Sequence, residues 1–207
     1  MSQIVALRPG KREQTKAANR LAILDAARAV FAEMGYETAT VRDIIRRTGL
    51  SVGAFYNYFR SREEVFEALA DDGARRFRPI LRECWERADT FEGYLRAAIQ
   101  AYYDFLADEH VSWQAMRPAG ERHPHITVHT PEMDRVFSEV RDAFAQAMEA
   151  GGAPRVDADF LAAACIAIAR EVGDRMLERR PIDTGAAADF AVRLILGGVP
   201  ALPRLPD

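Results

Sequence analysis

Residues 51–59, with the sequence SVGAFYNYF, hold four aromatic rings within nine positions. On an α-helix, which turns by about 100° per residue, Phe55 and Phe59 share one face and can form a small core. Tyr56 and Tyr58 then lie away from that face. They either pack at its margin or contact something outside the chain. In both cases the stretch must be a short helix with a small, polar outer face.

Helix start and stop signals surround this stretch. Gly35 supplies a helix stop, and Thr40 caps a short helix that Gly49 ends. Ser51 caps the helix that contains the aromatic residues. The inward stripe of the Thr40 helix is Val41, Ile44, Ile45 and Thr48. Two short helices joined by a tight turn around Gly49 form a helix-turn-helix arrangement.

The apolar pattern is helical along the whole chain and predicts an all-α fold. Apolar residues recur at spacings of three and four, and no strand-like alternation persists. A first helix is expected over 17–34, and Ser61 with Glu64 forms a capping box that starts another, running to about residue 88. Gly73 and Pro79 are expected to disturb that helix.

Four further helices are expected in the second half of the chain. Two of them are indicated by wide apolar faces, from Phe91 to Phe105 and from Met133 to Met148. The others are expected over about 157–179, which is rich in alanine, and 185–198. Small residues allow close approach between helices, although a buried core helix would have the same composition.

Basic charge is concentrated at the amino-terminal end. Residues 1–65 contain 11 Lys+Arg and 7 Asp+Glu, a net charge of +4, whereas the remainder contains 17 and 24, a net charge of −7. Five basic residues crowd the first segment: Arg8, Lys11, Arg12, Lys16 and Arg20. Such an arm can attract phosphates, and a solvated tail would have the same composition.

Length, apolar runs and cysteine positions indicate the size class of the protein and its cellular compartment. The chain of 207 residues can form one large domain or two small ones. We find neither a signal-peptide pattern nor an apolar run of about 18 residues, so no membrane span is expected. Cys84 and Cys165 lie inside helical patterns and are expected to be buried thiols in a reducing cytoplasm.

The segment GYETATVRDIIRRTGLSVGAFYNYFRSREEVFEAL resembles the DNA-binding segment of TetR-type bacterial transcriptional regulators. The resemblance covers roughly residues 17–66. Departures are mild, with Ile45 and Thr48 at positions where alanine is usual and Arg62 where lysine is common. It implies a basic arm over 1–16, a three-helix DNA-binding domain over 17–66 with its helix-turn-helix motif at about 40–59, and an effector-binding and dimerisation domain over 67–207.

The resemblance also implies a set of DNA contacts. The matching positions are Thr40, Arg42, Val52, Gly53, Ala54, Tyr56, Tyr58 and Arg62. Tyr56, Tyr58 and Arg62 would contact phosphates, whereas Val52 and Ala54 offer only apolar contacts to bases. Arg42 is then the best candidate for a hydrogen-bonded base contact.

The partners implied are double-stranded operator DNA, a second copy of the chain and a small effector. The last two long helices of such regulators pair with those of a second copy to form a homodimer. Repression, with release from a palindromic operator when the effector binds, is the expected outcome. Activation stays open because it depends on operator position.

An excess of large apolar side chains in the second domain predicts a pocket for a lipophilic effector, although a close-packed core would use the same residues. The expected lining is Trp85, Tyr94, Tyr102, Phe105, Trp113, Met116, Phe137 and Phe144, with His123 and Arg170 as candidate polar anchors.

Three of the four histidines, His123, His125 and His129, lie in one irregular segment. A metal site is one interpretation, but no carboxylate or cysteine lies at a helical spacing among them, so an exposed or ligand-gating loop is preferred. No catalytic motif is found, and neither a cofactor nor enzyme activity is expected. The alternative function is a helical-bundle carrier or enzyme that uses the loop at 123–129.

Overall fold

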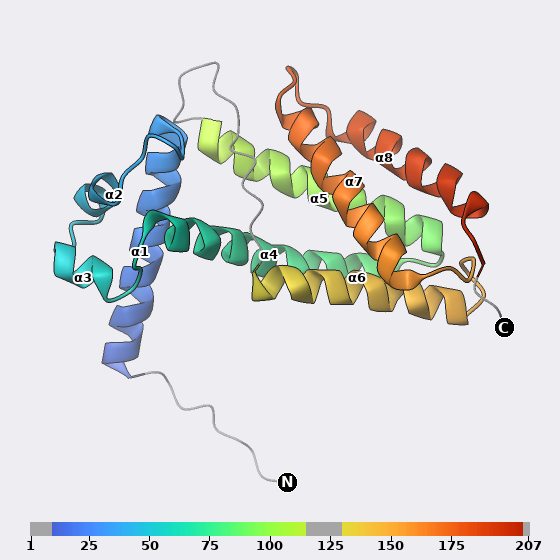
Figure 1. Ribbon diagram of the computed structural model, residues 1–207, viewed down its shortest axis with the longest axis horizontal. Helices are drawn as coiled ribbons and strands as arrows, with labels where there is room; N and C mark the ends of the chain where they lie inside the picture. The colour runs from blue at the N-terminus through green and yellow to red at the C-terminus, as the bar shows by residue number, and fades with distance from the viewer. Residues whose placement is uncertain (1–9, 115–129, 205–207) are drawn as a thin grey trace, which may run out of the picture.

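The computed structural model describes residues 10–114 and 130–204, with side chains for 10–109 and 130–204. Within these ranges every regular element is helical, which confirms the all-α prediction. Figure 1 shows the order of the helices along the chain. They are α1 (Lys11–Met34), α2 (Val41–Thr48), α3 (Val52–Tyr56), α4 (Arg62–Arg87), α5 (Phe91–Gln114), α6 (Pro131–Glu149), α7 (Ala158–Leu177), α8 (Thr184–Gly198) and a 3₁₀ turn, η1 (Val199–Ala201).

Two hydrophobic cores organise these helices. The first lies among α1, α2, α3 and the first turns of α4, and the second lies among α4 to α8. Helix α4 contributes to both, with Val65 and Leu69 in the first core and Phe77 and Leu81 in the second. The boundary predicted between residues 66 and 67 therefore falls within a continuous helix that belongs to both halves of the molecule.

Helix α4 continues through the two residues that were expected to disturb it. It is α-helical from Arg62 to Arg87, with Pro79 inside it. Proline removes one intrahelical hydrogen bond, but here its ring is exposed while Phe77 and Leu81 on either side are buried. Packing of these neighbours compensates for the lost bond.

Helix α1 begins earlier than the apolar pattern indicated. It starts at Lys11 rather than near residue 17, so part of the expected arm is helical. All side chains from Lys11 to Ala18 are exposed. A helix without a buried face gives no periodic apolar signal, which is why the pattern missed these turns.

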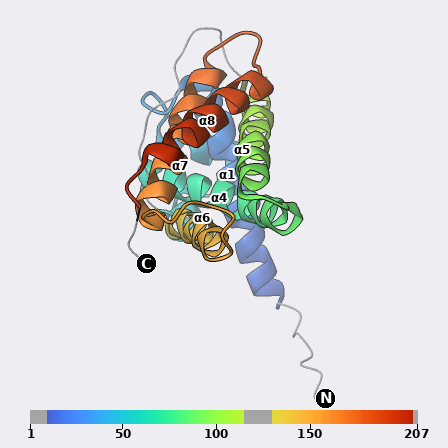
Figure 2. The ribbon, with the colours of Figure 1, turned by 90° about the vertical axis from the view of Figure 1, so that its right-hand side faces the viewer.

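The second core is built from helices that cross α4 and one another. Helix α5 packs against α4, α7 and α8, and α6 packs against α4 and α7. Helices α7 and α8 lie side by side, away from α2 and α3 (Figures 1 and 2). None of the described helices is long and apolar enough to span a membrane.

The two cysteines are free thiols. Cys165 is buried as expected, and burial raises its pKa to about 12, so it is an unreactive thiol at neutral pH. Cys84 is only half-buried, although burial also raises its pKa.

A glycine fixes the distance between α5 and α7. A Cβ atom added to Gly173 would lie 2.8 Å from Leu106 Cδ1 and 3.2 Å from Tyr103 Cε1. Tyr103 is fully buried and has no room to move away. The α5–α7 contact therefore depends on the absence of a side chain at position 173.

We predict that Gly173→Ala lowers the free energy of unfolding by about 1 kcal/mol, and by no more than about 3 kcal/mol. Overpacking costs about 1–3 kcal/mol, and the better helix propensity of alanine recovers at most about 1 kcal/mol. Gly73→Ala in α4 is the matched control, since its Cβ would meet no described atom within 4 Å. It should stabilise by about 0.5–1 kcal/mol. Urea unfolding followed by circular dichroism measures both, and equal effects would contradict the packing argument.

Candidate functional site

Helix α3 presents the two faces that its sequence predicts. The Ser51 side chain caps it by accepting a hydrogen bond from the Ala54 N–H at 3.2 Å. Phe55 and Phe59 are buried in the first core together with Ile44 and Ile45 of α2. The inward orientation of these two rings is confirmed, and it fixes the opposite face of α3 outward.

The outer face of α3 consists of small residues beside exposed apolar ones. Val52 is 57% exposed and Tyr56 is 52% exposed. A Cβ atom on Gly53 would meet no described atom within 4 Å, and its φ angle is not positive. Within residues 10–109 and 130–204, neither packing nor backbone conformation requires glycine at position 53.

The two tyrosines of α3 and its C-terminal turn are not equivalent. Tyr56 is exposed, whereas Tyr58 is half-buried against the first core. The Asn19 side-chain amide donates a hydrogen bond to the Tyr58 hydroxyl at 3.2 Å. A tyrosine hydroxyl can accept and donate at once, so this contact orients Tyr58 without using its proton.

The three arginines of α2 differ in their availability. Arg47 forms a bidentate pair with Glu33 of α1, with both N–O distances at 2.6 Å. Arg46 lies 3.3 Å from Asp43. Arg42 is exposed, and no ion pair is described for it within residues 10–109 and 130–204. Arg47 is thus held by a bidentate pair, whereas the guanidiniums of Arg42 and Arg46 are exposed.

Thr40 begins α2 through a capping box. Its hydroxyl accepts from the Asp43 N–H at 3.3 Å, and the Asp43 carboxylate accepts from the Thr40 N–H at 3.0 Å. The Thr40 hydroxyl and N–H hold the pKa of Asp43 below its usual value. Gly49 then ends α2 in the left-handed region at φ 67°, which favours glycine and explains the tight turn before α3.

Arg62 has a role that the sequence analysis did not predict. Its Nη1 donates to three backbone oxygens of the loop between α1 and α2, those of Tyr36 (2.8 Å), Glu37 (3.1 Å) and Ala39 (3.1 Å). Its guanidinium also lies 4.2 Å from the centre of the Tyr36 ring. Arg62 therefore holds the loop that leads into α2. No spacing in the sequence signals such a long-range contact with backbone oxygens.

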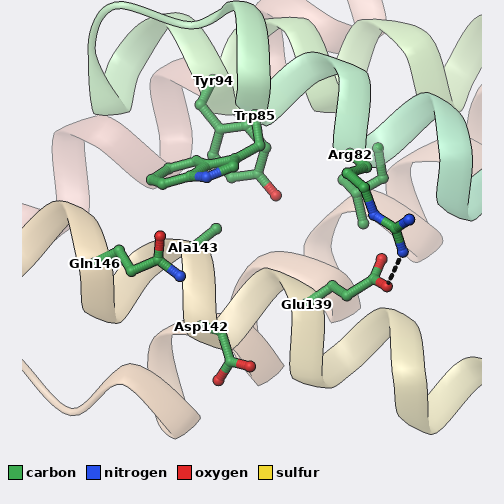
Figure 3. Close-up of a pocket in the computed structure, with 8 residues that line it drawn as sticks. Arg82, Trp85, Tyr94, Glu139, Asp142, Ala143 and Gln146 are labelled. Atoms are coloured by element: carbon green, nitrogen blue, oxygen red, sulfur yellow. Dashed lines mark hydrogen bonds and ion pairs between the residues drawn. The ribbon is translucent and has the colours of Figure 1, made fainter. Parts of the chain in front are cut away.

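A separate pocket opens between α4 and α6, with a volume of about 230 Å³ (Figure 3). Trp85 and Tyr94, both predicted to line an effector pocket, form its aromatic wall. The rest of its lining was not predicted: Leu81, Arg82, Glu139, Asp142, Ala143 and Gln146. Four of these residues, Arg82, Glu139, Asp142 and Gln146, are polar, so an excess of large apolar side chains gives no signal for them.

The remaining predicted effector residues are distributed over other places. Tyr102 packs edge-on against Phe77, and Phe105 lies beside the same ring. Burial and Asp174 raise the pKa of Tyr102 to about 12, against a smaller lowering by Arg170.

Phe144 is almost fully buried in the core, where it contacts Phe91 and Tyr94. Phe137 is half-buried against the same core. The side chains of Trp113, Met116 and His123 lie outside the described residues, as does the loop at 123–129 on which the metal and enzyme alternatives depended. Within the described side chains, no group of three or more His, Cys, Asp or Glu residues could hold a metal ion.

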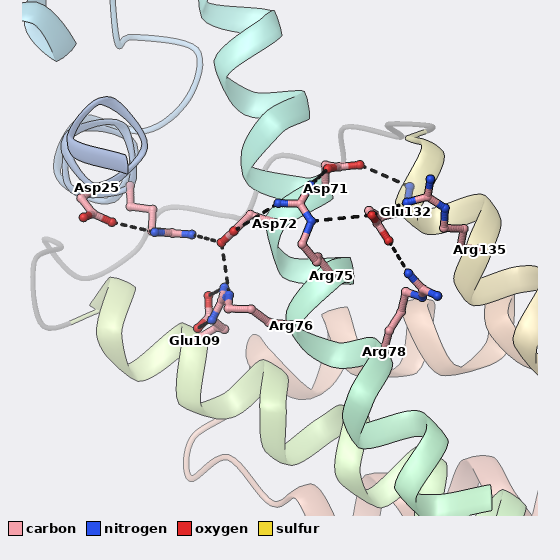
Figure 4. Close-up of polar contacts among 10 residues, drawn as sticks. Asp25, Asp71, Asp72, Arg75, Arg76, Arg78, Glu109, Glu132 and Arg135 are labelled. Carbon is pink, nitrogen blue, oxygen red and sulfur yellow. Dashed lines mark hydrogen bonds and ion pairs between the residues drawn. The ribbon is translucent and has the colours of Figure 1, made fainter. Parts of the chain in front are cut away.

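A chain of ion pairs connects α1 to the second core through α4 (Figure 4). Arg28 of α1 contacts Asp72 of α4 at 2.6 Å and Asp25 at 2.8 Å. Asp72 also pairs with Arg76 at 3.2 Å, and Arg76 forms a bidentate pair with Glu109 of α5. Asp72 is thus the carboxylate shared between helices of the two cores.

A second branch of ion pairs runs from α4 to α6. The Glu132 N–H donates to Asp71 at 3.2 Å, and the Glu132 side chain accepts from Arg78 at 2.8 Å. Glu132 is a buried acidic residue, and burial alone would raise its pKa. Its pairs with Arg78, Arg135 and Arg75 reverse the shift and lower it. The carboxylate is therefore charged at neutral pH and fixes the start of α6 on α4.

Arg78 extends this branch to the pocket. Its Nη2 lies 2.6 Å from Glu139 Oε1, and Arg82 Nη2 lies 2.8 Å from the same oxygen. Glu139 and Arg82 both line the pocket (Figure 3). Polar contacts therefore run continuously along α4 from the pocket to the neighbourhood of Asp72.

Comparison with known proteins places this arrangement in a class of bacterial regulators. Residues 23–69, which contain the helix-turn-helix, match bacterial regulatory proteins of the tetR family. An HTH-type transcriptional repressor of Mycobacterium tuberculosis, Rv1474c, is 42% identical over 72 residues, which are 35% of this chain and 38% of that protein. The match therefore spans little more than a third of that relative's length.

Longer similarities extend over both cores. The transcriptional activator FasR of Mycolicibacterium smegmatis is 28% identical over 187 residues, covering 87% of this chain and 83% of that protein. The fatty acid degradation regulator FadR of Bacillus halodurans has the same fold, with a TM-score of 0.71 at 20% identity over 93% of this chain and 98% of that one. Residues 23–69 thus match the tetR family, as the resemblance of the helix-turn-helix segment implied, and the chain shares the fold of a fatty acid degradation regulator.

We predict that Arg62→Ala lowers the free energy of unfolding by about 2 kcal/mol, because hydrogen bonds to a charged group contribute about 1.5–3 kcal/mol. Arg46→Ala is the control, since its side chain is 78% exposed and its pair with Asp43 contributes little. Guanidinium unfolding of both variants measures the difference. A loss below about 0.5 kcal/mol for Arg62→Ala would show that the loop is held by other contacts.

Proposed function

We propose that this protein is a transcriptional repressor that binds a duplex operator through α2 and α3 and releases it when a lipophilic small molecule binds among α4 to α8. The observation that carries the DNA-binding part is the outer face of α3. Val52 and Tyr56 are exposed there beside Gly53, which no contact within the described chain explains. A small, uncharged face of this kind can enter a major groove without a clash.

The proposed contacts divide into positioning and specifying groups. Tyr56 and Tyr58 donate to phosphates and set the position of α3 on the duplex, and Thr40 lies at the start of α2, where backbone N–H groups favour phosphate. Arg42 contacts a base edge, and Val52 and Ala54 offer apolar contacts to thymine methyl groups. Arg62 contributes through the loop that it holds, and a direct phosphate contact is not needed for the proposal.

The positive charge of the first 65 residues also supports the proposal that DNA binds the part of the molecule that contains α2 and α3. Their net charge is +4, against −7 for the rest of the chain. Counterion release from the duplex should therefore contribute to affinity and weaken binding as salt increases. The second part of the molecule carries the opposite charge and would be repelled by DNA.

Repression is the proposed sign of regulation. The M. tuberculosis relative is a repressor and the M. smegmatis relative an activator, so the family fold serves both outcomes. A regulator that binds DNA through a helix-turn-helix blocks polymerase when its operator overlaps a promoter. Transcription in vitro from a promoter that contains the selected operator tests the sign directly.

Selection of duplexes from a random library by the full chain tests the proposed function. A pseudo-palindromic consensus should emerge, and affinity for it should fall steeply between about 50 and 200 mM salt. Arg42→Ala should weaken binding by about 1–3 kcal/mol and relax preference at one position in each half-site. If no sequence is enriched over the starting library, the DNA-binding proposal is wrong.

We predict that Gly53→Ala separates stability from DNA binding. The described chain has free space for the added methyl group, and alanine favours the helix, so the melting temperature should stay the same or rise. Affinity for the selected operator should fall at least about tenfold, since a steric clash at the interface costs 1.4 kcal/mol or more. Gly73→Ala, which also adds a methyl group into free space but lies far from α3, should retain full affinity.

The proposed dimer uses α7 and α8. These two helices expose the large apolar side chains Phe160 (77%), Phe190 (60%) and Leu194 (52%). Ala163, Ala164 and Ala167 are exposed on α7 as well. A second copy of the chain is the occupant proposed for this face, because a palindromic operator needs two recognition helices on one two-fold axis.

We predict that Leu194→Glu converts the protein to a monomer of 23.1 kDa. A buried, unpaired carboxylate at the interface should raise the dimer dissociation constant at least about tenfold. The control is Leu21→Glu, because Leu21 is equally exposed, at 53%, on α1. Sedimentation velocity at micromolar concentration distinguishes the two. The assignment fails if both variants sediment like the unchanged protein.

A further inference from the structure

The face of α1 that packs in the first core continues beyond that core as a row of basic side chains. Ile23 and Ala27 are fully buried on this face. Arg20, Lys16 and Arg12 precede Ile23 at successive spacings of three, four and four residues, which on an α-helix places all of them in line with it. We call Arg12, Lys16 and Arg20 the basic ridge of α1.

Two members of the basic ridge lie on turns of α1 that none of the other described helices covers. Figures 1 and 2 show these first turns projecting beyond the remaining helices. The side chains of Arg12 and Lys16 are exposed, and within residues 10–109 and 130–204 no ion pair is described for either of them. An amphipathic helix extends its inward stripe with apolar residues as long as a core covers it. Here basic residues replace them where the core ends, so this face is suited to an anionic partner.

The third member of the basic ridge connects it to the end of α3. The Arg20 guanidinium lies over the Phe59 ring, 5.4 Å from its centre. Asn19, the next residue along α1, donates a hydrogen bond of 3.2 Å to the Tyr58 hydroxyl. Lys16 lies one helical turn before these two residues, about 5 Å along the axis. The ridge therefore begins beside the Tyr58 hydroxyl and runs from there toward the start of α1.

The charge of the basic ridge is opposed only weakly within its own helix. Residues 10–20 contain four basic residues and one acidic residue, Glu13, which gives a net charge of +3. Glu13 lies beside Lys16 at a spacing of three residues, but no ion pair between them is found among the described side chains. Lys11 lies about 140° around the helix from Lys16 and is not part of the ridge. Three of the four positive charges are therefore on the face that continues toward α3.

We propose that the basic ridge binds the phosphate backbone of duplex DNA next to the phosphate that Tyr58 contacts. The inference rests on the proposed function, because it places the duplex against α3 and Tyr58. The Tyr58 hydroxyl accepts from Asn19 and so keeps its proton for a phosphate. Lys16 and Arg12 follow about 5 and 10 Å further along α1, and one DNA strand carries a phosphate for every ~3.4 Å of helix rise. The ridge therefore reaches phosphates within about three nucleotides of the one on Tyr58.

Such contacts would extend the bound surface beyond the helix-turn-helix. Phosphates are the same in every sequence, so the ridge positions the duplex and adds affinity without adding sequence preference. Each phosphate that a basic side chain neutralises releases counterions and steepens the dependence of affinity on salt. The ridge therefore predicts a part of the salt dependence that can be removed by substitutions outside α2 and α3.

The salt dependence of affinity for the selected operator tests the basic ridge. In Lys16→Gln each subunit of the proposed dimer loses one phosphate contact, so the slope of log affinity against log salt should become shallower by about 1.8. The affinity lost between about 50 and 200 mM salt should then be about tenfold smaller than for the unchanged protein. Sequence preference should stay the same, because no base contact is removed. An unchanged slope would overturn the assignment.

Lys11→Gln is the matched control. It removes the same charge from an exposed lysine of the same helix, but from a face about 140° away. Its slope should remain close to that of the unchanged protein. Equal effects of Lys11→Gln and Lys16→Gln would show that binding depends on net charge alone and that the ridge is not a site. Both side chains are exposed, so neither variant should change the melting temperature, and a folding defect cannot imitate the expected result.

Interference by ethylated phosphates locates the contact. A phosphate whose ethylation weakens binding of the unchanged protein, but not of Lys16→Gln, is one that Lys16 contacts. Such phosphates should lie within about three nucleotides of those that the same comparison with Tyr58→Phe identifies. Phosphates outside this range would contradict the geometry of the ridge.

A duplex of mixed sequence separates failure of the ridge from failure of the proposed function. If selection enriches no operator, the proposed function is wrong, and the two lysine variants are compared on the mixed duplex. A shallower slope for Lys16→Gln than for Lys11→Gln would then support the ridge by itself, and equal slopes would refute it. If an operator is selected but Lys16→Gln keeps its full salt dependence, the proposed function stands and the ridge is refuted.

Discussion

The arrangement of the two halves depends on one carboxylate, Asp72. It lies on α4 between the two cores and pairs with Arg28 of α1 and with Arg76, which in turn holds Glu109 of α5. The Asp72 side chain is only 17% exposed, so its pairs are screened less than surface ion pairs. Without it, Arg28 would keep only Asp25 of its own helix and Arg76 only Glu109, so the ion-pair link from α1 to α5 through α4 would be broken.

Helix α4 is one continuous helix that packs in both cores and so links their positions. Val65 and Leu69 anchor its start in the first core, and Phe77 and Leu81 anchor the following turns in the second. A packed core resists continuous deformation, so α4 can change position only by exchanging one set of contacts for another. Its arginine pairs are well suited to such an exchange, because ion pairs can be re-formed with neighbouring carboxylates without opening a cavity.

Much of the fold was accessible from the sequence because the relevant signals are local. Thr40, Gly49 and Ser51 mark the helix-turn-helix through caps and a left-handed turn, and the structure contains all three features. The start of α1 was missed because its first turns bury nothing. The continuity of α4 through Pro79 was missed because it depends on packing on either side of the proline, which no local signal records.

Less of the site was predictable, because many of its contacts join residues that are far apart in the sequence. The facing of Phe55 and Phe59 follows from helical spacing, but the engagement of Arg62 with the loop oxygens depends on contacts 23 to 26 positions apart in the sequence. In the effector region, Trp85 and Tyr94 were found because aromatic residues were sought. Glu139 was overlooked because it is polar and because its pairs with Arg78 and Arg82 join residues 57 to 61 positions apart in the sequence.

The early start of α1 has a consequence for how the protein melts. Residues 11–18 are exposed throughout, so helicity there depends on intrinsic propensity and on the turns that follow, without tertiary packing. Such turns fray progressively with temperature, whereas the two cores unfold cooperatively. The far-ultraviolet signal of the native protein should therefore carry a sloping baseline that begins well below the main transition. Near-ultraviolet signals from the buried aromatic residues should stay flat over the same range, so coincidence of the two probes is a poor test of two-state unfolding for this chain.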